Sequence, residues 1–353
     1  MKFLIVTQAI DLDDPVLGFF HRWVEEFSKH CESVHVICLK EGRHSLPANV
    51  SVHSLGKEHV YRIPYTVYRI RFVQRIRYVL RFWSYIWKLR NEYDAIFVHM
   101  NQEYVLLGGK FWWLLGKRVI LWRNHKMGSA WTRIAGFFAH TMCYTSPEAY
   151  VAKFKNAIKM PIGIDTDFFK PSAVPAPAGT ILFLGRLDAV KKPDMFLHAM
   201  GILRRDGISV HADVYGDPTP GRESFARKLK SDFASFKRVS FHRAVRNDET
   251  PAIYNAHSIY VNLTPSGSFD KTIGEAMACG SVVVAANDAV RSAVPPACMV
   301  DSQSAESVAA GMRAAIALSE DKRRELAKKL RAYVVREHSL RLLAERMFGI
   351  LAT

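Results

Sequence analysis

The 353-residue sequence predicts an α/β protein of two domains, each a parallel sheet covered by helices. Short apolar runs alternate with segments of helical apolar spacing along the chain, which is typical of strands joined by helical crossovers. A proline-rich stretch at 170–179 interrupts this alternation once. The length suffices for two cores of common size, and 49% of the residues are hydrophobic.

The first half of the chain shows four clear strand patterns. Apolar runs predict strands at 2–7, 33–39, 95–99 and 118–122. Between the first two, residues 21–30 carry helical apolar spacing, and they predict a helix. The opening apolar run is short and soon meets acidic residues, which favours a buried strand over a signal peptide.

The second half begins after three prolines within 170–179, a composition typical of a linker. Strands are then expected at 180–185, 210–216 and 239–241, with a helix starting near Pro193. A last helix is predicted at 339–351. The expected domains are therefore 1–172 and 173–338, followed by a C-terminal helix at 339–353 that is free to pack back on the first domain.

Residues 258–286, SIYVNLTPSGSFDKTIGEAMACGSVVVAA, predict a strand, a turn, a helix closed by Gly280 and a second strand. This order brings the backbone amides of 267–271 and the carboxylate of Glu275 to one helix N-terminus. Such a terminus has unpaired N–H groups and partial positive charge, so it suits a phosphate or a sugar oxygen. An ordinary strand–helix–strand unit is the alternative interpretation.

A basic turn, GRLDAVKK at 185–192, directly follows the strand expected at 180–185. Gly185 permits a sharp turn, and Arg186 and Lys191 leave the same strand end before a helix. Open α/β sheets bind anions at such strand ends. A leaving diphosphate gains negative charge, which a guanidinium and an ammonium together stabilise. Taken alone, an Arg and a Lys at this spacing are better explained as solvated loop charges.

Three motifs in this order resemble the retaining glycosyltransferases of family 4, which have the two-domain GT-B fold. They are GRLDAVKK, VSFHRAVRNDETPAIYNAHSIYV and SGSFDKTIGEAMACGSVVVA, and they cover nearly all of the second domain. In the first half the likeness rests on HMNQEY and LWRNH, each after a strand, and on TSPEAY and PIGIDTDFF. The resemblance implies a GT-B architecture, with two Rossmann-like domains facing each other across a cleft. The first domain would serve the acceptor, and the second the nucleotide-sugar donor.

The resemblance also implies site residues. Arg186 and Lys191 would hold the donor's diphosphate, and Glu275 would bind the ribose hydroxyls. His99 would lie beside the donor sugar, with His125 as a further substrate contact; a buried or capped histidine at a strand end is the alternative for both. The backbone of Ala244, Val245 and Arg246 would frame the nucleotide base. The remaining donor-binding residues are Gly18, Gly267, Ser268, Phe269, Asp270 and Lys271.

Two positions depart from the family pattern. The family usually shows Glu-x7-Glu, and the position of the first Glu is occupied here by Gly267. Contact with the transferred sugar would then come from backbone amides or from neighbours such as Ser268, Asp270 and Lys271. In the first loop, Gly18 stands where relatives often carry two glycines; it would still permit close approach to the diphosphate.

Retention is expected through the resemblance: the diphosphate leaves toward Arg186 and Lys191 while the acceptor hydroxyl attacks from the same face. We see no metal-ligand spacing and expect no cofactor besides the nucleotide-diphosphate sugar as co-substrate. The alternatives are an inverting transferase, a sugar-nucleotide epimerase, or a non-catalytic membrane- or RNA-binding protein, which the missing Glu favours. No GxGxxG follows the first strand, which argues against a nicotinamide enzyme.

Residues 61–90 combine eight basic residues with nine aromatics and no acid. A helix is expected at 68–89, since no proline or glycine interrupts it. Cations with Trp and Tyr suit a helix at an anionic membrane surface. A core helix with a solvated basic face, or a single-strand nucleic-acid site, are the alternatives. The predicted membrane-binding residues are Arg69, Arg71, Arg75, Arg77, Arg81, Trp83 and Trp87, with Arg62, Lys88 and Arg90 adding to the charge.

The overall composition bounds partners and compartment. A net charge of +16 favours anionic partners. Five cysteines without a CxxC pair indicate reduced thiols, and no uncharged apolar stretch is long enough to span a bilayer. We therefore expect a cytoplasmic protein, peripheral at the inner face of the membrane, that works on a lipid-linked acceptor or a cell-envelope glycan precursor. No nucleic-acid partner is expected.

Overall fold

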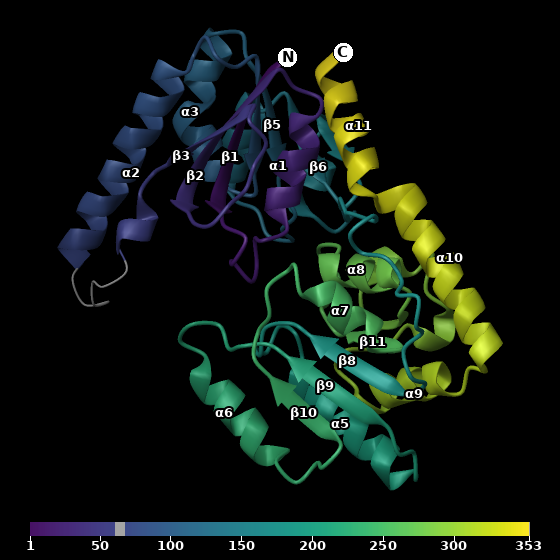
Figure 1. The fold of residues 1–353 in the computed structure, drawn as a ribbon. Coiled ribbons are helices and arrows are strands. Elements are labelled where there is room, and N and C mark those ends of the chain that lie inside the picture. The colour runs from purple at the N-terminus through teal and green to yellow at the C-terminus, as the bar shows by residue number, and fades with distance from the viewer. Residues whose placement is uncertain (61–67, 353) are drawn as a thin grey trace. The chain divides into compact units, whose positions relative to one another are not determined.

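A computed structural model describes residues 1–60 and 68–352 of the chain (Figure 1). It divides into two compact units, each with its own sheet and core. The first unit comprises Met1–Met160 and Leu343–Thr353, and the second comprises Pro161–Leu342. An α/β class with two parallel sheets, as expected from the sequence, is confirmed.

The division between the units lies ahead of the boundary expected at 172/173. Ile162 and Ile164 are the reason, because both side chains belong to the core of the second unit. They lie against Gly274, where a Cβ atom would come within 2.7 Å of Ile162. The proline-rich stretch therefore lies within the second unit rather than between the two.

The first unit contains seven parallel strands in the order β3-β2-β1-β4-β5-β6-β7. The bounds of β4 and β5 match the expected strands, whereas β1 and β2 extend further, to Ile10 and Glu41. The sequence did not indicate β3, β6 or β7. The strands are β1 (Lys2–Ile10), β2 (Ser33–Glu41), β3 (Val50–Ser54), β4 (Ala95–His99), β5 (Arg118–Trp122), β6 (Thr141–Tyr144) and β7 (Ala157–Lys159).

Helices cover both faces of this sheet. On one face, Phe27 of α1 and Phe348 of α11 pack on Phe3, with ring centroids 6.4 and 5.4 Å from it. The other face carries α2, α3 and α4, whose inner side chains join a second cluster with Leu4 and Val98. The helices are α1 (Phe20–Ser28), η1 (Lys57–Val60), α2 (Tyr68–Lys88), α3 (Gln102–Leu114), α4 (Ala130–Phe138), η2 (Tyr150–Lys153) and α11 (Leu340–Ala352).

The second unit has five parallel strands in the order β10-β9-β8-β11-β12. Helix α5 packs with α9, whereas α8 packs with α7 and α10. The strands are β8 (Thr180–Leu184), β9 (His211–Tyr215), β10 (Val239–His242), β11 (Ile259–Asn262) and β12 (Val282–Ala285). The helices are α5 (Pro193–Arg205), α6 (Glu223–Asp232), α7 (Thr250–Asn255), α8 (Lys271–Cys279), η3 (Asp288–Val290), η4 (Pro296–Cys298), α9 (Ala305–Ile316) and α10 (Glu320–His338).

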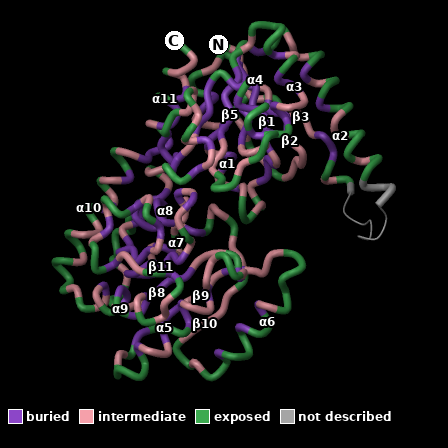
Figure 2. Tube along the Cα trace, turned by 180° about the vertical axis from the view of Figure 1, so that it is seen from behind, coloured by how far each residue is buried: buried purple, intermediate pink, exposed green. Residues whose placement is uncertain are grey.

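Both sheets are doubly wound, and buried residues concentrate on their strands (Figure 2). In each, the strand order reverses beside the first strand of the unit: between β1 and β4 in the first, and between β8 and β11 in the second. Open parallel sheets bind ligands at the carboxyl ends of the strands at such a point. The segments that follow β8 and β11 are therefore where a ligand site is expected in the second unit.

Candidate functional site

The basic turn after β8 is shaped by a close backbone approach to the next strand. Gly216 follows β9 with a φ of +154°, and a Cβ atom there would lie 1.9 Å from the carbonyl oxygen of Gly185. The Gly185 amide in turn donates to the Tyr215 carbonyl at 3.0 Å. The absence of a side chain at Gly216 thus fixes where the turn that carries Arg186 and Lys191 leaves the sheet.

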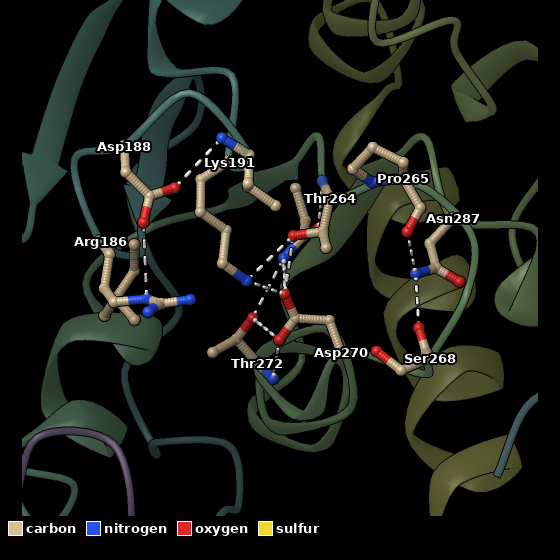
Figure 3. Close-up of polar contacts among 12 residues, drawn as sticks. Arg186, Asp188, Lys191, Thr264, Pro265, Ser268, Asp270, Thr272 and Asn287 are labelled. Atoms are coloured by element: carbon tan, nitrogen blue, oxygen red, sulfur yellow. Dashed lines mark hydrogen bonds and ion pairs between the residues drawn. The ribbon is translucent and has the colours of Figure 1, made fainter. Parts of the chain in front are cut away.

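Lys191 crosses from this turn to the N-terminus of α8. Its ammonium lies 2.5 Å from Asp270 Oδ2 and donates to Thr264 Oγ1 at 3.0 Å (Figure 3). Asp270 is the N-cap of α8 and accepts from the Thr272 amide. The structure therefore brings together two motifs that lie 79 residues apart in the sequence. An ammonium has three donors, so one N–H of Lys191 remains beyond these two partners.

The carboxylate of Asp270 is held in its ionised form. Besides Lys191, it accepts from Thr264 Oγ1 at 2.8 Å and from Asn262 Nδ2 at 3.1 Å. Burial by itself raises the pKa of a carboxyl group, but the Lys191 charge and these hydrogen bonds outweigh burial, so the pKa of Asp270 lies well below its usual range. The pair is thus a fixed dipole at the switch point of the sheet.

Arg186 is more open to solvent than Lys191. Its side chain is about half exposed, and its Nε lies 3.8 Å from Asp188 Oδ2 in the same turn (Figure 3). Asp188 also accepts from the Thr219 hydroxyl at 2.8 Å, which limits its movement. Arg186 therefore presents its guanidinium from the same strand end as Lys191, as the sequence predicts.

Asn287 holds the turn between β11 and α8 in place through a hydrogen bond. This fully buried side chain donates to the Ser268 carbonyl at 2.8 Å. Gly267 has a φ of +145°, a conformation that L-residues rarely adopt, so a Glu at this family position would strain the backbone as it stands. Phe269 is buried, with its ring 4.8 Å from His338, and its predicted contact with the donor stays a prediction.

Lys271 and the buried Glu275 lie one turn apart on α8 and interact electrostatically. The Lys271 ammonium donates to the carbonyls of Ile162 and Gly163, at 2.5 and 3.0 Å. Burial lowers the pKa of Lys271 to about 7, although the charge of Glu275 opposes this shift. Burial also raises the pKa of Glu275, against the opposing charge of Lys271. Lys271 thus ties the first turn of α8 to the start of the second unit.

Glu275 is connected to the segment expected to frame the base. Its Oε1 is 3.4 Å from Asn247 Nδ2, and its Oε2 accepts from the Tyr254 hydroxyl at 3.0 Å. Asn247 directly follows the expected base-binding residues Ala244, Val245 and Arg246. Within that segment, the exposed Arg246 donates to Asp248 through two nitrogens. The structure therefore gathers the expected diphosphate, ribose and base elements within the second unit.

His99 ends β4 in the first unit and is buried among aromatic rings. Its imidazole stacks on Phe20, with ring centroids 4.3 Å apart, and its Nδ1 lies 3.4 Å from Thr7 Oγ1. The ring is only 3% exposed, which agrees with the alternative interpretation of a buried histidine at a strand end. A role beside the donor sugar stays a prediction.

The other two expected residues of the first unit lie in loops. His125 is exposed, and its Nδ1 accepts from the Met127 amide at 2.9 Å, which orients the ring toward its own loop. Gly18 is buried, and its amide donates to the Asp14 carbonyl at 2.9 Å. Their contacts with substrate also stay predictions.

Two cavities of the second unit are lined by none of the predicted site residues. One, of about 300 Å³, is lined by 171–176, by the ends of α7 and α8, and by α10. The other, of about 420 Å³, lies where α5, β9 and β10 begin or end. Tyr254 lines the first cavity while its hydroxyl holds Glu275, so it connects this cavity to the candidate ribose site.

Helix α2 confirms the helix expected in the basic aromatic stretch. Arg62 and the side chains of Arg69 and Arg71 lie outside the described residues. Of the other predicted membrane-binding residues, the exposed ones are Arg75, Arg77, Arg81, Trp83 and Trp87. Among the described helices, none is both long and apolar enough to cross a bilayer.

Sequence reasoning missed several residues that shape the site. Asn262, Thr264 and Thr272 donate hydrogen bonds to Asp270. Tyr254 donates to Glu275, and Asn287 donates to the Ser268 carbonyl in the turn before α8. Small polar residues flanking a predicted ligand turn are the signal that points to the first three. Tyr254 and Asn287 carry no local signal, because they come from other elements.

Comparison with known proteins connects this geometry to a family. Residues 178–318 match the family described as Glycosyl transferases group 1. This segment of the chain is thus similar to glycosyl transferases of group 1. The match covers β8 through α9 and includes all of the candidate donor residues of the second unit.

Curated sequence relatives match a similar share of the chain. D-inositol 3-phosphate glycosyltransferase of Arthrobacter sp. (strain FB24) is 29% identical over 147 residues, which is 38% of this chain and 35% of the relative. The protein of the same name from Frankia alni is 30% identical over 140 residues, 35% of this chain and 34% of the relative. The chain thus spans about a third of the length of these curated relatives.

Solved structures share the fold over the whole chain. Anabaena HepE in complex with UDP and glucose has a TM-score of 0.75 at 16% identity, with 100% of both chains covered. Sucrose-phosphate synthase from Thermosynechococcus elongatus has a TM-score of 0.77 at 18% identity, covering 100% of this chain and 98% of that one. The GT-B fold, with two Rossmann-like units, is confirmed.

Proposed function

We propose that this protein is a retaining glycosyltransferase that moves a sugar from a nucleotide-diphosphate donor to an acceptor hydroxyl. The observation that carries the proposal is the contact of Lys191 with the N-cap of α8, because it joins the basic turn to the helix that bears Glu275. The family match over 178–318 supports transferase chemistry, and the relatives act, by their names, on inositol phosphate.

In the proposed reaction, the bond between the sugar C1 and the diphosphate oxygen breaks as the acceptor oxygen bonds to C1 on the same face. The acceptor proton passes to the leaving diphosphate. Arg186 and the remaining N–H of Lys191 stabilise the charge that develops on the diphosphate, so the reaction needs no metal in this role. Glu275 would accept from the ribose hydroxyls, and the turn at 267–271 would orient the sugar.

The first test is nucleotide binding by calorimetry with UDP, GDP, ADP, dTDP and CMP. We expect one diphosphate to bind, with UDP the first candidate because Anabaena HepE was solved with it. Arg186→Gln should weaken binding of that diphosphate by about 10- to 100-fold, since hydrogen bonds between charged groups contribute about 1.5–3 kcal/mol. Binding of the bare nucleoside should change little.

The matched control is Arg227→Gln, which neutralises an exposed arginine of α6 in the same unit. It should bind like the wild type. Glu275→Gln keeps the shape of the side chain and should also reduce affinity, through the ribose. If none of the diphosphates binds, or if Arg186→Gln binds as tightly as the wild type, the donor-site assignment fails.

The stereochemistry is tested separately. The protein is incubated with sugar donors of the nucleotide that binds and with an acceptor that carries a hydroxyl group. NMR of the product should then show that the transferred sugar keeps the anomeric configuration that it had in the donor. An inverted product would establish an inverting transferase, and conversion of the donor without acceptor would establish an epimerase. As acceptor we propose a lipid-linked or cell-envelope glycan precursor at the cytoplasmic face of the membrane, which the charge and the exposed aromatics of α2 support.

A further inference from the structure

Helix α2 carries two apolar stripes on different sides. Phe82 and Ile86 are buried in the core of the first unit. A second stripe runs along the helix at spacings of three and four residues, which places its members on one side of the helix. This stripe is exposed: Phe72, Ile76, Leu80, Trp83 and Trp87 are between 42 and 66% accessible. A helix that faces only water carries polar residues on that side.

The exposed stripe continues onto the neighbouring helices. The Trp83 indole donates to the Leu107 carbonyl of α3 at 3.1 Å, and the Trp87 ring lies 5.7 Å from Phe111. Helix α3 packs closely on α4, since a Cβ on Gly109 would lie 2.6 Å from the Cβ of Phe138. Further exposed residues on these two helices are Trp113, Leu114, Trp131, Ile134 and Phe137. In the described part of the chain, every exposed Phe or Trp lies on α2, α3 or α4.

Cations accompany this apolar surface. Arg77, Arg81 and Lys88 follow at helical spacing along α2, beside the exposed stripe, although Arg81 also donates to the Leu55 carbonyl at 2.9 Å. Lys110 of α3 and Arg133 of α4 are exposed as well. The sequences of the three helices contain a single acidic residue, Glu103. The surface is therefore complementary to a partner that is both apolar and anionic.

We infer that the outer faces of α2, α3 and α4 together form a docking surface for an anionic lipid bilayer. Tryptophans and phenylalanines enter the boundary between headgroups and acyl chains, and the cations meet the anionic headgroups. A nucleic acid would stack on the aromatic rings but would bury little of the aliphatic side chains Ile76, Leu80, Leu114 and Ile134. Lipid acyl chains would bury these side chains, which is energetically favourable. The inference deepens the acceptor part of the proposed function and does not depend on its donor chemistry.

The test uses the full-length protein without nucleotide and vesicles of phosphatidylcholine with or without 30% phosphatidylglycerol. All seven tryptophans lie before residue 132, and four are exposed on this surface, so their fluorescence should shift to the blue on anionic vesicles. Trp113→Ser with Phe137→Ser should weaken cosedimentation at least tenfold. Arg77→Gln with Lys88→Gln should weaken it about 25-fold, or about fivefold for each cation near the surface.

Val174→Ser with Val190→Ser, and Arg227→Gln with Lys237→Gln, alter exposed residues of the second unit and should leave binding unchanged. Absence of wild-type binding to anionic vesicles would overturn the inference, as would aromatic variants that bind fully. If those variants instead turn a dimer into a monomer in light scattering, a second copy covers the surface. Diphosphate binding in solution is measured independently, so either proposal can fail alone.

Discussion

At the scale of single residues, Asp270 links three parts of the candidate site. It caps α8, pairs with Lys191 and gathers hydrogen bonds from Asn262 and Thr264. Lys191 is thereby held in place before any diphosphate arrives. Such preorganisation avoids the cost of ordering a flexible lysine side chain when the ligand binds.

The pairing predicts a pH-dependent loss of stability in Asp270→Asn. Asn still caps a helix but leaves the Lys191 ammonium without its counter-charge, so the free energy of unfolding should fall by about 2–3 kcal/mol at pH 7. Because the pKa of Asp270 is depressed in the folded state, its contribution is complete above its unfolded pKa of about 4. Urea unfolding across pH should therefore show the difference from wild type shrinking as pH falls below about 4.

A surface pair serves as the control for this prediction. Asp232 of α6 accepts from Lys228 at 2.9 Å, but both side chains are largely exposed. Asp232→Asn should cost no more than about 0.5 kcal/mol, as is usual for an exposed pair at this helical spacing. Equal losses in the two variants, or a difference that persists unchanged at pH 2.5, would contradict the proposed role of Asp270.

The position of a single residue could be predicted only where its neighbours in the sequence determine it. The positions of Arg186 and Lys191 at one strand end follow from a glycine after an apolar run. The partner of Lys191 does not, because Asp270 comes from a segment 79 residues away. Likewise, the sequence alone left open whether His99 is a ligand or a buried ring, since two of the rings that contact it, Phe20 and Trp23, come from α1.

At the scale of elements, the approach of the loop after β9 to the loop after β8 makes a testable prediction. A methyl group in Gly216→Ala would collide with the Gly185 carbonyl, so we expect a loss of about 3 kcal/mol and a weakened diphosphate affinity. Gly207 also has a positive φ, +77°, but nothing lies within 4 Å of a Cβ there. Gly207→Ala should lose only about 1 kcal/mol and bind nucleotide normally, which thermal denaturation and calorimetry will check.

Element prediction succeeded where strands are buried on both faces. Residues of β4 and β5 form continuous apolar runs, and their bounds were predicted correctly. The strands β3 and β7 contain fewer fully buried residues and lie at the edges of the sheet, so no such run marks them. The helices α3 and α4 were not predicted, and neither were their exposed aromatics, because both sides of these helices are apolar and give little amphipathic signal.

At the scale of the whole molecule, one helix that covers the sheet of the first unit, α11, is separated in the sequence from the rest of that unit by the entire second unit. Phe348 of α11 packs on Phe3 and Phe27 and stacks on His30. Phe348→Ala should destabilise the first unit by about 2 kcal/mol through lost burial. Because all the tryptophans lie in this unit, their fluorescence during urea unfolding reports on it alone.

The same variant should leave the second unit intact, so diphosphate affinity at low urea should equal that of the wild type. Arg346→Ala, an exposed change on the same helix, is the control and should unfold like the wild type. An unchanged fluorescence midpoint for Phe348→Ala would mean that α11 contributes little to the first unit. The sequence predicted this helix and left it free to pack on the first domain, but it did not indicate the residues that it contacts, which lie more than 300 residues upstream.

The position of α11 also has a consequence for biosynthesis. A ribosome makes residues 1–160 well before residues 343–353, so the apolar face of their sheet around Phe3 and Phe27 stays uncovered until α11 has emerged. The second unit, by contrast, is contiguous at 161–342, and its residues have all been made before α11 is complete. During synthesis, therefore, the unit that is made second can finish folding first, and the first unit needs protection from aggregation until α11 has emerged.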